Sequence, residues 1–468
     1  MLFNSYQFLL LFLPVTLLGI YLLTWYRQER AAIWFAGLAS LAFYTAGEKH
    51  VVFILIASII FNYLLGNEIL QCKEKRSDKT AKIIVCLGIA ANLGLLGYFK
   101  YTNFFVDNLD NLFSLHLEIA RIALPIGISF YTFTQIGFLV DCNRNESHRY
   151  RFGDYLLFVT YFPHLVAGPI LNHKSIIPQF EAGKFGRPSA KPLYQAAIFF
   201  STGLFKKIII ADNLSSYVHI FFDHAQSLNV IEAWSAALLY TFQLYYDFSG
   251  YSEMAVGLSL LMNIDIPINF NSPYKSASIV EFWRRWHISL SLLLRDYIYI
   301  PLGGNRKGEA RRYLNLIITM FLGGFWHGAG WTFILWGLMH GCALAVNHLW
   351  QRLKKPLPRT IGIPLTFLFV IVGWVVFRSQ NLPTAWQMIS AMLGLHPSPE
   401  HSKLSPLVHH LSSSLAWLSL LLAWCFFAPN TQEMAVRPRW YVAVIAACLF
   451  AAAFMSIDKA SDFLYFKF

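Results

Sequence analysis

Long apolar runs, separated by short polar and basic loops, recur along nearly the whole of this 468-residue chain. A helix needs about 20 apolar residues to cross the roughly 30 Å hydrocarbon core of a bilayer, and many of the runs approach or exceed that length. Only 13% of the residues are charged, which is about half the share found in soluble domains. A soluble protein of this size could not cover its surface with so few charges. The pattern therefore predicts an all-α, polytopic integral membrane protein.

The runs predict roughly 11 to 13 transmembrane or re-entrant segments. Two runs, 193–222 and 313–349, are too long for one crossing, so each is expected to be tilted, broken or made of more than one helix. The predicted spans lie near residues 7–25, 31–46, 51–70, 83–100, 122–140, 153–170, 193–222, 232–262, 313–349, 361–378, 412–428 and 440–457.

The net charge is +12, from 37 basic and 25 acidic residues. The basic residues sit in short loops beside apolar runs, which is the pattern that cytoplasmic retention produces. This placement makes the charge a topology signal and argues against nucleic acid as a partner. The loops 26–30, 71–82 and 141–152 are therefore predicted to be cytoplasmic, with the N-terminus outside. The first run has no small-residue cleavage site after it and no basic residue before it, so it is expected to stay as a span.

The six cysteines show neither a CxxC motif nor paired spacing. This argues against a disulfide framework and against a zinc site, and the cysteines are expected to be small buried apolar residues. No HExxH motif, nucleophile elbow or Walker loop is present either, so no metal and no bound cofactor is predicted.

Residues 263–312 break the pattern, because they are rich in Pro, Asn and charge and yet highly aromatic. Irregular backbone survives at membrane depth only where protein or a wet cavity surrounds it. We therefore expect a re-entrant or interfacial element here, and a site. A second irregular stretch, 394–411, is predicted to be a solvated polar loop.

The densest chemical cluster is EFWRRWHISLS at 281–291. A helix starting near Ser278 would place Arg284 and Arg285 three and four residues after Glu281, which suits local ion pairs. Trp283, His287 and Ser291 would then share one face. The arginines and tryptophans fit an interfacial anchor helix equally well, but His287 amid this density favours a functional role.

A second cluster, GGFWHGAGW at 323–331, lies inside an apolar run. Gly324 and Gly328 have the small-xxx-small spacing that lets helices approach closely. A histidine in such a run, His327, is costly to charge, and neutral imidazole can act as a general base. The alternative for His327 is a core histidine bonded to a backbone carbonyl. His340 lies 13 residues further on and faces roughly the opposite side of the helix, so a structural role is expected for it.

Several motifs together resemble the membrane-bound O-acyltransferase family, and its bacterial alginate O-acetylase branch in particular. They include YTFQLYYDFSGYS at 240–252, FNSPY at 270–274, EFWRRWHISLS at 281–291, RDYIYIPLGGNR at 295–306, WHGA at 326–329 and LPIGISFYTF at 124–133. The likeness covers nearly the whole chain. It implies a single domain over 1–468, with core motifs in 124–345 and peripheral helices in 1–100 and 361–468.

The resemblance also implies a function: transfer of an acyl group, expected to be acetyl from acetyl-CoA, across the bacterial inner membrane for O-acylation of an extracytoplasmic polysaccharide such as alginate. It places the catalytic histidines at His327 and His287, in a central tunnel, with a periplasmic SGNH-type enzyme as partner. Donor-binding or supporting roles are expected for Arg284, Arg285, Arg295, Asp296, Trp326 and Asn271. Acylation of cellulose or peptidoglycan, D-alanyl transfer, and a non-catalytic transporter or scaffold stay open as alternatives.

Overall fold

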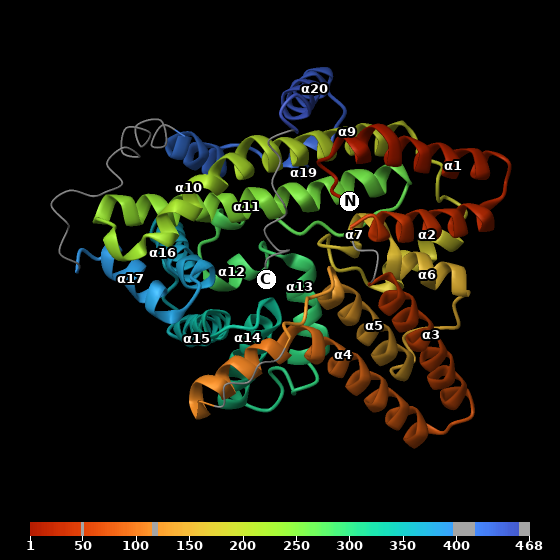
Figure 1. Cartoon of the computed structure of the whole chain (residues 1–468), viewed down its shortest axis with the longest axis horizontal. Coiled ribbons are helices and arrows are strands. Elements are labelled where there is room, and N and C mark those ends of the chain that lie inside the picture. The colour runs from red at the N-terminus through yellow and green to blue at the C-terminus, as the bar shows by residue number, and fades with distance from the viewer. Residues whose placement is uncertain (48–50, 115–119, 396–416, 458–468) are drawn as a thin grey trace. The chain divides into compact units, whose positions relative to one another are not determined.

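The computed structural model describes residues 1–47, 51–114, 120–395 and 417–457. Helices are the only regular elements in those ranges (Figure 1), which confirms the all-α prediction. The contacts group the chain into two compact units: unit 1 holds Met1–Thr202, Tyr251–Pro267 and Ala435–Cys448, and unit 2 holds Gly203–Gly250, Ile268–Met434 and Leu449–Phe468. That the whole chain acts as a single domain stays a prediction.

The helices of unit 1 come mainly from the first 202 residues of the chain. They are η1 (Phe8–Phe12), α1 (Leu13–Trp25), α2 (Glu29–Thr45), α3 (Val52–Glu74), α4 (Asp78–Phe113), α5 (Ile128–Asn143), α6 (Phe152–Thr160), α7 (Phe162–Leu165), α8 (His173–Glu181), nearly all of α9 (Ala190–Phe205) and most of α20 (Trp440–Phe454).

Helices α3, α4 and α5 lie side by side (Figure 1). Gly66 of α3 has no room for a side chain, because a Cβ there would lie 2.3 Å from the ring of Phe138. Asn62 and Asn92 exchange two buried amide hydrogen bonds, of 3.1 and 2.7 Å, between α3 and α4. Small residues and buried amides are the usual means of packing helices in a membrane.

Unit 2 begins with the π-helix η2 (Lys206–Ala211) and carries the central motifs. Its other helices are α10 (Asp212–Asp223), η3 (Ala225–Ser227), the first two-thirds of α11 (Val230–Leu261), η4 (Pro273–Lys275), α12 (Ile279–Trp283), α13 (Ile288–Leu294), η5 (Arg295–Tyr299), α14 (Glu309–His327), α15 (Trp331–Arg352), α16 (Arg359–Arg378), α17 (Leu382–Met392), the helix Trp417–Phe427 and α19 (Thr431–Ala435).

The hairpin of α14 and α15 is closed by glycines. A Cβ on Gly324 would lie 2.3 Å from the carbonyl oxygen of Phe333, and a Cβ on Gly337 would lie 2.4 Å from that of Met320. The predicted close approach at Gly324 is therefore confirmed. Gly328 instead lies beyond the end of α14, where Phe333 fills the space.

Six helical segments of the described chain are long and apolar enough to cross a membrane: Phe8–Trp25, Val52–Glu74, Asp78–Phe113, Ala190–Asp223, Trp331–Arg352 and Arg359–Arg378. The long run 193–222 is one helical stretch with a π-helical turn inside it, and the run 313–349 is two helices that break at Gly328 and Gly330. The segment 263–312 holds only short helices and loops, as predicted.

Three expectations need correction or fall outside the described residues. The run 153–170 is not a single span, because α6 ends at Thr160 and the chain turns at Tyr161. Only Cys142 and Cys425 of the six cysteines are buried, while Cys86, Cys342 and Cys448 are exposed on their helices. Most of the predicted loop 394–411 lies outside the described residues.

Candidate active site

His287 occupies a sharp break between two short helices of unit 2. As predicted, α12 begins after Ser278, whose hydroxyl accepts a hydrogen bond of 3.1 Å from the backbone N–H of Glu281. Arg285 pairs with Glu281 at 3.0 Å. The helix then ends at Trp283, and His287 has φ +43° and ψ +55°, a left-handed conformation that is uncommon outside glycine. The prediction that Trp283, His287 and Ser291 share one helical face is therefore wrong.

Residues 269–271 hold this break from the side. The N–H of Asn271 donates to the carbonyl of Arg285 (2.9 Å), and the N–H of Ile288 donates to the carbonyl of Asn269 (3.0 Å). The side-chain oxygen of Asn269 accepts two further hydrogen bonds from Ser289, from its N–H (3.1 Å) and from its hydroxyl (2.6 Å). These bonds lie on both sides of His287 and fix its backbone.

The ring of His287 is fully buried, with 0% of its surface exposed. Neither ring nitrogen has a hydrogen-bond partner among the described residues. The ring of Phe248 stands edge-on to it, with 4.7 Å between ring centroids. Burial lowers the pKa of His287 to about 3, so the imidazole is neutral at physiological pH. Buried polar groups nearly always have a partner, so an imidazole of this kind is suited to bind a polar ligand.

His327 is the last residue of α14 and is only 5% exposed. Aromatic rings surround it nearly edge-on. Trp336 lies 5.1 Å away at 88°, Phe377 lies 5.4 Å away at 79°, and Trp326 lies 5.0 Å away at 64°. The glycine-closed hairpin supplies Trp336, and α16 supplies Phe377. The packing of three helices thus holds the imidazole of His327 in one place.

The structure brings the two predicted histidines together. Their ring centroids lie 6.5 Å apart, with 58° between the ring planes, although 40 residues separate them in sequence. Trp326 lies beside both, 6.5 Å from His287. Two buried imidazoles at this separation can contact the same small reacting group, one as a proton acceptor and the other as a hydrogen-bond donor.

Asn271 and Arg285 support the break that carries His287. The guanidinium of Arg285 donates to the carbonyl of Asn271 (3.1 Å), and the side-chain oxygen of Asn271 accepts from Asn430 (3.0 Å). Their hydrogen bonds therefore order the backbone around His287.

The other predicted residues, Arg284, Arg295 and Asp296, have side chains that are partly or largely exposed. Arg295 and Asp296 pair with each other at 2.6 Å on η5, with side chains 55% and 39% exposed. Arg284 is exposed on the loop after α12. The structure therefore places Arg284, Arg295 and Asp296 at a surface of unit 2.

Sequence reasoning missed Asn269 and Trp336, since neither stands in a recognisable motif. It assigned His340 a structural role, and that role stays a prediction. The ring of His340 is fully buried, and its Nδ1 accepts a hydrogen bond of 3.2 Å from the indole N–H of Trp283. Trp336 lies between the two histidines, 4.7 Å from the ring of His340 and 5.1 Å from that of His327.

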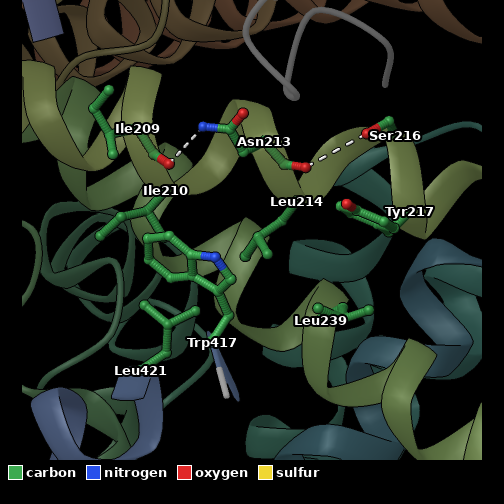
Figure 2. A pocket seen from close by; sticks show the side chains of 9 residues that line it. All are labelled: Ile209, Ile210, Asn213, Leu214, Ser216, Tyr217, Leu239, Trp417 and Leu421. Atoms are coloured by element: carbon green, nitrogen blue, oxygen red, sulfur yellow. Dashed lines mark hydrogen bonds between the residues drawn. The ribbon is translucent and has the colours of Figure 1, made fainter. Parts of the chain in front are cut away.

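A pocket of about 310 Å³ in unit 2 contains none of these residues (Figure 2). Trp417 and Leu421 face α10 across it, and Asn213, Ser216 and Tyr217 bring the polar atoms of its lining. The side chain of Asn213 is already used, because it donates to the carbonyl of Ile209 at 2.7 Å.

The described chain thus combines six helices able to cross a membrane with two buried histidines that lie close together in unit 2. The family model of the membrane-bound O-acyltransferases matches residues 98–383. This chain belongs to that family, and it is an acyltransferase.

Relatives extend the match to the whole chain. The peptidoglycan O-acetyltransferase of Helicobacter pylori is 37% identical over 100% of this chain and 98% of its own length. The probable alginate O-acetylase of Pseudomonas aeruginosa is 42% identical over 84% of this chain and 75% of its own. The teichoic acid D-alanyltransferase of Streptococcus thermophilus is 31% identical over 54% of this chain and 68% of its own.

Proposed function

We propose that this protein moves an acetyl group from a thioester donor to a hydroxyl, for O-acetylation of an extracytoplasmic polysaccharide. The observation that carries the proposal is the buried pair of His287 and His327, whose ring centroids lie 6.5 Å apart. The relatives named for O-acetylation of alginate and of peptidoglycan support the acyl group and the acceptor class.

His327 is the general base of the proposed reaction. Its ring nitrogen takes the proton from the acceptor hydroxyl while that oxygen attacks the thioester carbonyl carbon. The tetrahedral intermediate then expels the thiolate, which takes the proton back from His327 and leaves as a thiol. One C–O bond forms and one C–S bond breaks, so no oxidant or other co-reactant is needed.

His287 orients and polarises the donor. Because its pKa is lowered to about 3, the ring stays neutral and offers one N–H to the carbonyl oxygen as negative charge develops there. In other acyl-transfer enzymes, a hydrogen-bond donor aimed at such an oxygen in a buried site lowers the activation barrier by about 2.7–4 kcal/mol. The hydrogen bonds on both sides of His287 fix its backbone and so keep its ring N–H in position.

Acetyl-CoA from the cytoplasm is the donor that we propose, with a central tunnel in the inner membrane as the route of the acetyl group. Arg306 and Lys307 are exposed in the turn before α14, and we propose that they bind the phosphates of the acetyl-CoA donor. Removing both charges should raise the KM for the donor with kcat unchanged, and an unchanged KM would exclude docking there.

The orientation follows the basic loops, with 71–82 and 141–152 in the cytoplasm. Single cysteines at Ser77 and Ser147, in a background without native cysteines, should resist an impermeant thiol reagent in intact cells. Labelling before lysis would reverse the orientation.

A periplasmic SGNH-type enzyme is the partner that would finish the transfer to an alginate-like polymer. Peptidoglycan is the second candidate acceptor, because the peptidoglycan O-acetyltransferase relative matches the full length of this chain. Acetyl content of each polymer in a deletion strain, with and without the restored gene, separates the two.

The test of the proposed function is His327→Ala. Losing a general base should lower the rate at least about 10²-fold, while membrane yield and melting temperature stay close to wild type. His224→Ala is the matched control, since the ring of His224 is exposed and bonds to the backbone carbonyl of Ile220 in α10. Full acetylation by His327→Ala would disprove the role of His327.

A further inference from the structure

A second hollow of unit 2 is an open, mainly apolar trough of about 730 Å³. It lies between the start of α16 and the helix Trp417–Phe427, on the side of that helix that does not face the pocket of Figure 2. Its lining residues are Lys275, Arg359, Ile363, Ser419, Leu422, Ala423, Phe426 and Phe427.

Two cations stand at one end of the trough. The ammonium of Lys275 donates to the carbonyl of Ala428 (2.9 Å), and the guanidinium of Arg359 donates to the carbonyl of Lys275 (3.3 Å). The carboxylate of Glu281 lies 3.5 Å from Arg359 and 3.0 Å from Arg285. Two lining cations therefore share this end of the trough with one carboxylate, whose charge is also paired with Arg285.

The trough runs from this charged end into an apolar region. Arg359 is the first residue of α16, which is long and apolar enough to span a membrane, and Ile363 lies one turn further along it. Ala428 follows the end of the helix Trp417–Phe427, so Leu422 and Ala423 lie one to two turns away from the cations. Cations at the end of a span stand at the level of lipid headgroups.

We propose that the trough binds one anionic phospholipid. Its phosphate lies between Lys275 and Arg359, and one acyl chain runs along Ile363, Leu422, Ala423 and Phe426. A free phosphate would use the cations but not the apolar wall. A neutral lipid would use the wall but not the charge. Arginine also offers a planar pair of donors that matches two phosphate oxygens.

The bound headgroup would act on the segment that carries His287. Tyr274, the neighbour of Lys275, stacks on Trp286 with 6.0 Å between centroids and 24° between planes. Arg359 shares Glu281 with Arg285, which is bonded to Asn271. Anionic lipid should therefore raise the rate of acyl transfer by ordering the break around His287. This effect rests on the proposed function, whereas the binding itself does not.

The test is lipid retention by the full chain in nanodiscs of phosphatidylcholine with about one-fifth phosphatidylglycerol. Native mass spectrometry measures how many molecules of each lipid stay bound. Lys275→Gln with Arg359→Gln should lower the preference for phosphatidylglycerol roughly tenfold or more, since each cation near a membrane surface is worth about 1 kcal/mol. Ala423→Trp, which fills the trough and keeps both cations, should lower it as well.

Lys355→Gln removes an exposed cation outside the trough and serves as the control. Equal retention in the double variant and in this control would overturn the proposal, as would unchanged retention in Ala423→Trp. Displacement of the lipid by millimolar inorganic phosphate alone would also overturn it, in favour of a plain anion site. If the double variant fails to fold, the lipid preference of Ala423→Trp still tests the proposal. Loss of lipid preference with normal acetylation would leave the binding site and remove only its link to His287.

Discussion

Two buried polar sites of unit 2, the Lys207 ion cluster and the ring of His287, differ in whether their polar atoms have partners. The ammonium of Lys207 lies 2.7 Å from a carboxylate oxygen of Asp212 and 2.7 Å from one of Asp247, with all three side chains almost fully buried. The ring of His287 is just as buried, yet neither of its nitrogens has a partner among the described residues. Charge inside a membrane protein is tolerated when it is paired. An unpaired imidazole costs stability, and such a cost is expected at a site that binds substrate.

The largest effect of this difference is expected at Lys207. Lys207→Met should cost about 3–5 kcal/mol of unfolding free energy, because it leaves two buried carboxylates without their shared cation. Thermal unfolding of the purified protein in detergent measures the loss. Lys191→Met, at an exposed lysine of α9, is the control.

A triple variant sharpens this result. Replacing Lys207 by Met together with Asp212→Asn and Asp247→Asn removes all three charges, and it should recover part of the lost stability. No difference between the single and triple variants would mean that the ion cluster does not hold this region together.

His287→Phe should do the opposite at neutral pH. It replaces a buried imidazole, which has no hydrogen-bond partner among the residues that the structure describes, with an apolar ring. Stability should therefore stay equal or rise while acetylation falls. The change of the unfolding free energy with pH measures how much the buried ring of His287 contributes. The folded pKa is about 3 and the unfolded one about 6.5. Between these values the unfolded state holds more protons, so stability is lost as pH falls.

For wild type this group alone should cost about 2 kcal/mol between pH 6.5 and pH 5. His287→Phe should lack this part of the slope, and melting curves at pH 7 and pH 5 for both proteins measure the difference. Identical slopes would show that the ring of His287 is charged or solvated in the folded state.

Asn269 tests the support of the site with a smaller effect. Asn269→Ala leaves the N–H and hydroxyl of Ser289 without their acceptor, at about 1–2 kcal/mol of stability. It should also lower kcat more than it raises KM, because the position of His287 changes and not donor affinity. Asn269→Asp keeps an acceptor oxygen for Ser289 and should recover part of kcat, although the buried carboxylate adds its own cost in stability. A change in KM alone would contradict this positioning role.

What the sequence could predict here was local. Ser278 caps α12 as expected, and Gly324 permits the approach of α14 and α15, because both effects depend on nearby residues. The break at His287 could not be predicted, since its positive φ is held by Asn269, 18 residues earlier in the chain. The rings around His327 likewise come from later helices, at spacings that only tertiary packing fixes.

The smallest effect is expected at Asp296, which the sequence placed near the site. Asp296 and Arg295 form an exposed pair, and such pairs contribute about 0–1 kcal/mol. Asp296→Asn should therefore change the unfolding free energy by less than about 0.5 kcal/mol and leave kcat unchanged. Because it releases the charge of Arg295, it should lower the KM for a polyanionic donor at low salt if that arginine contacts the donor. The effect should disappear near 0.15 M salt, where screening over about 8 Å weakens exposed charges. A fall in kcat as large as that of Asn269→Ala would instead show that Asp296 acts on the histidines although its ion pair is exposed.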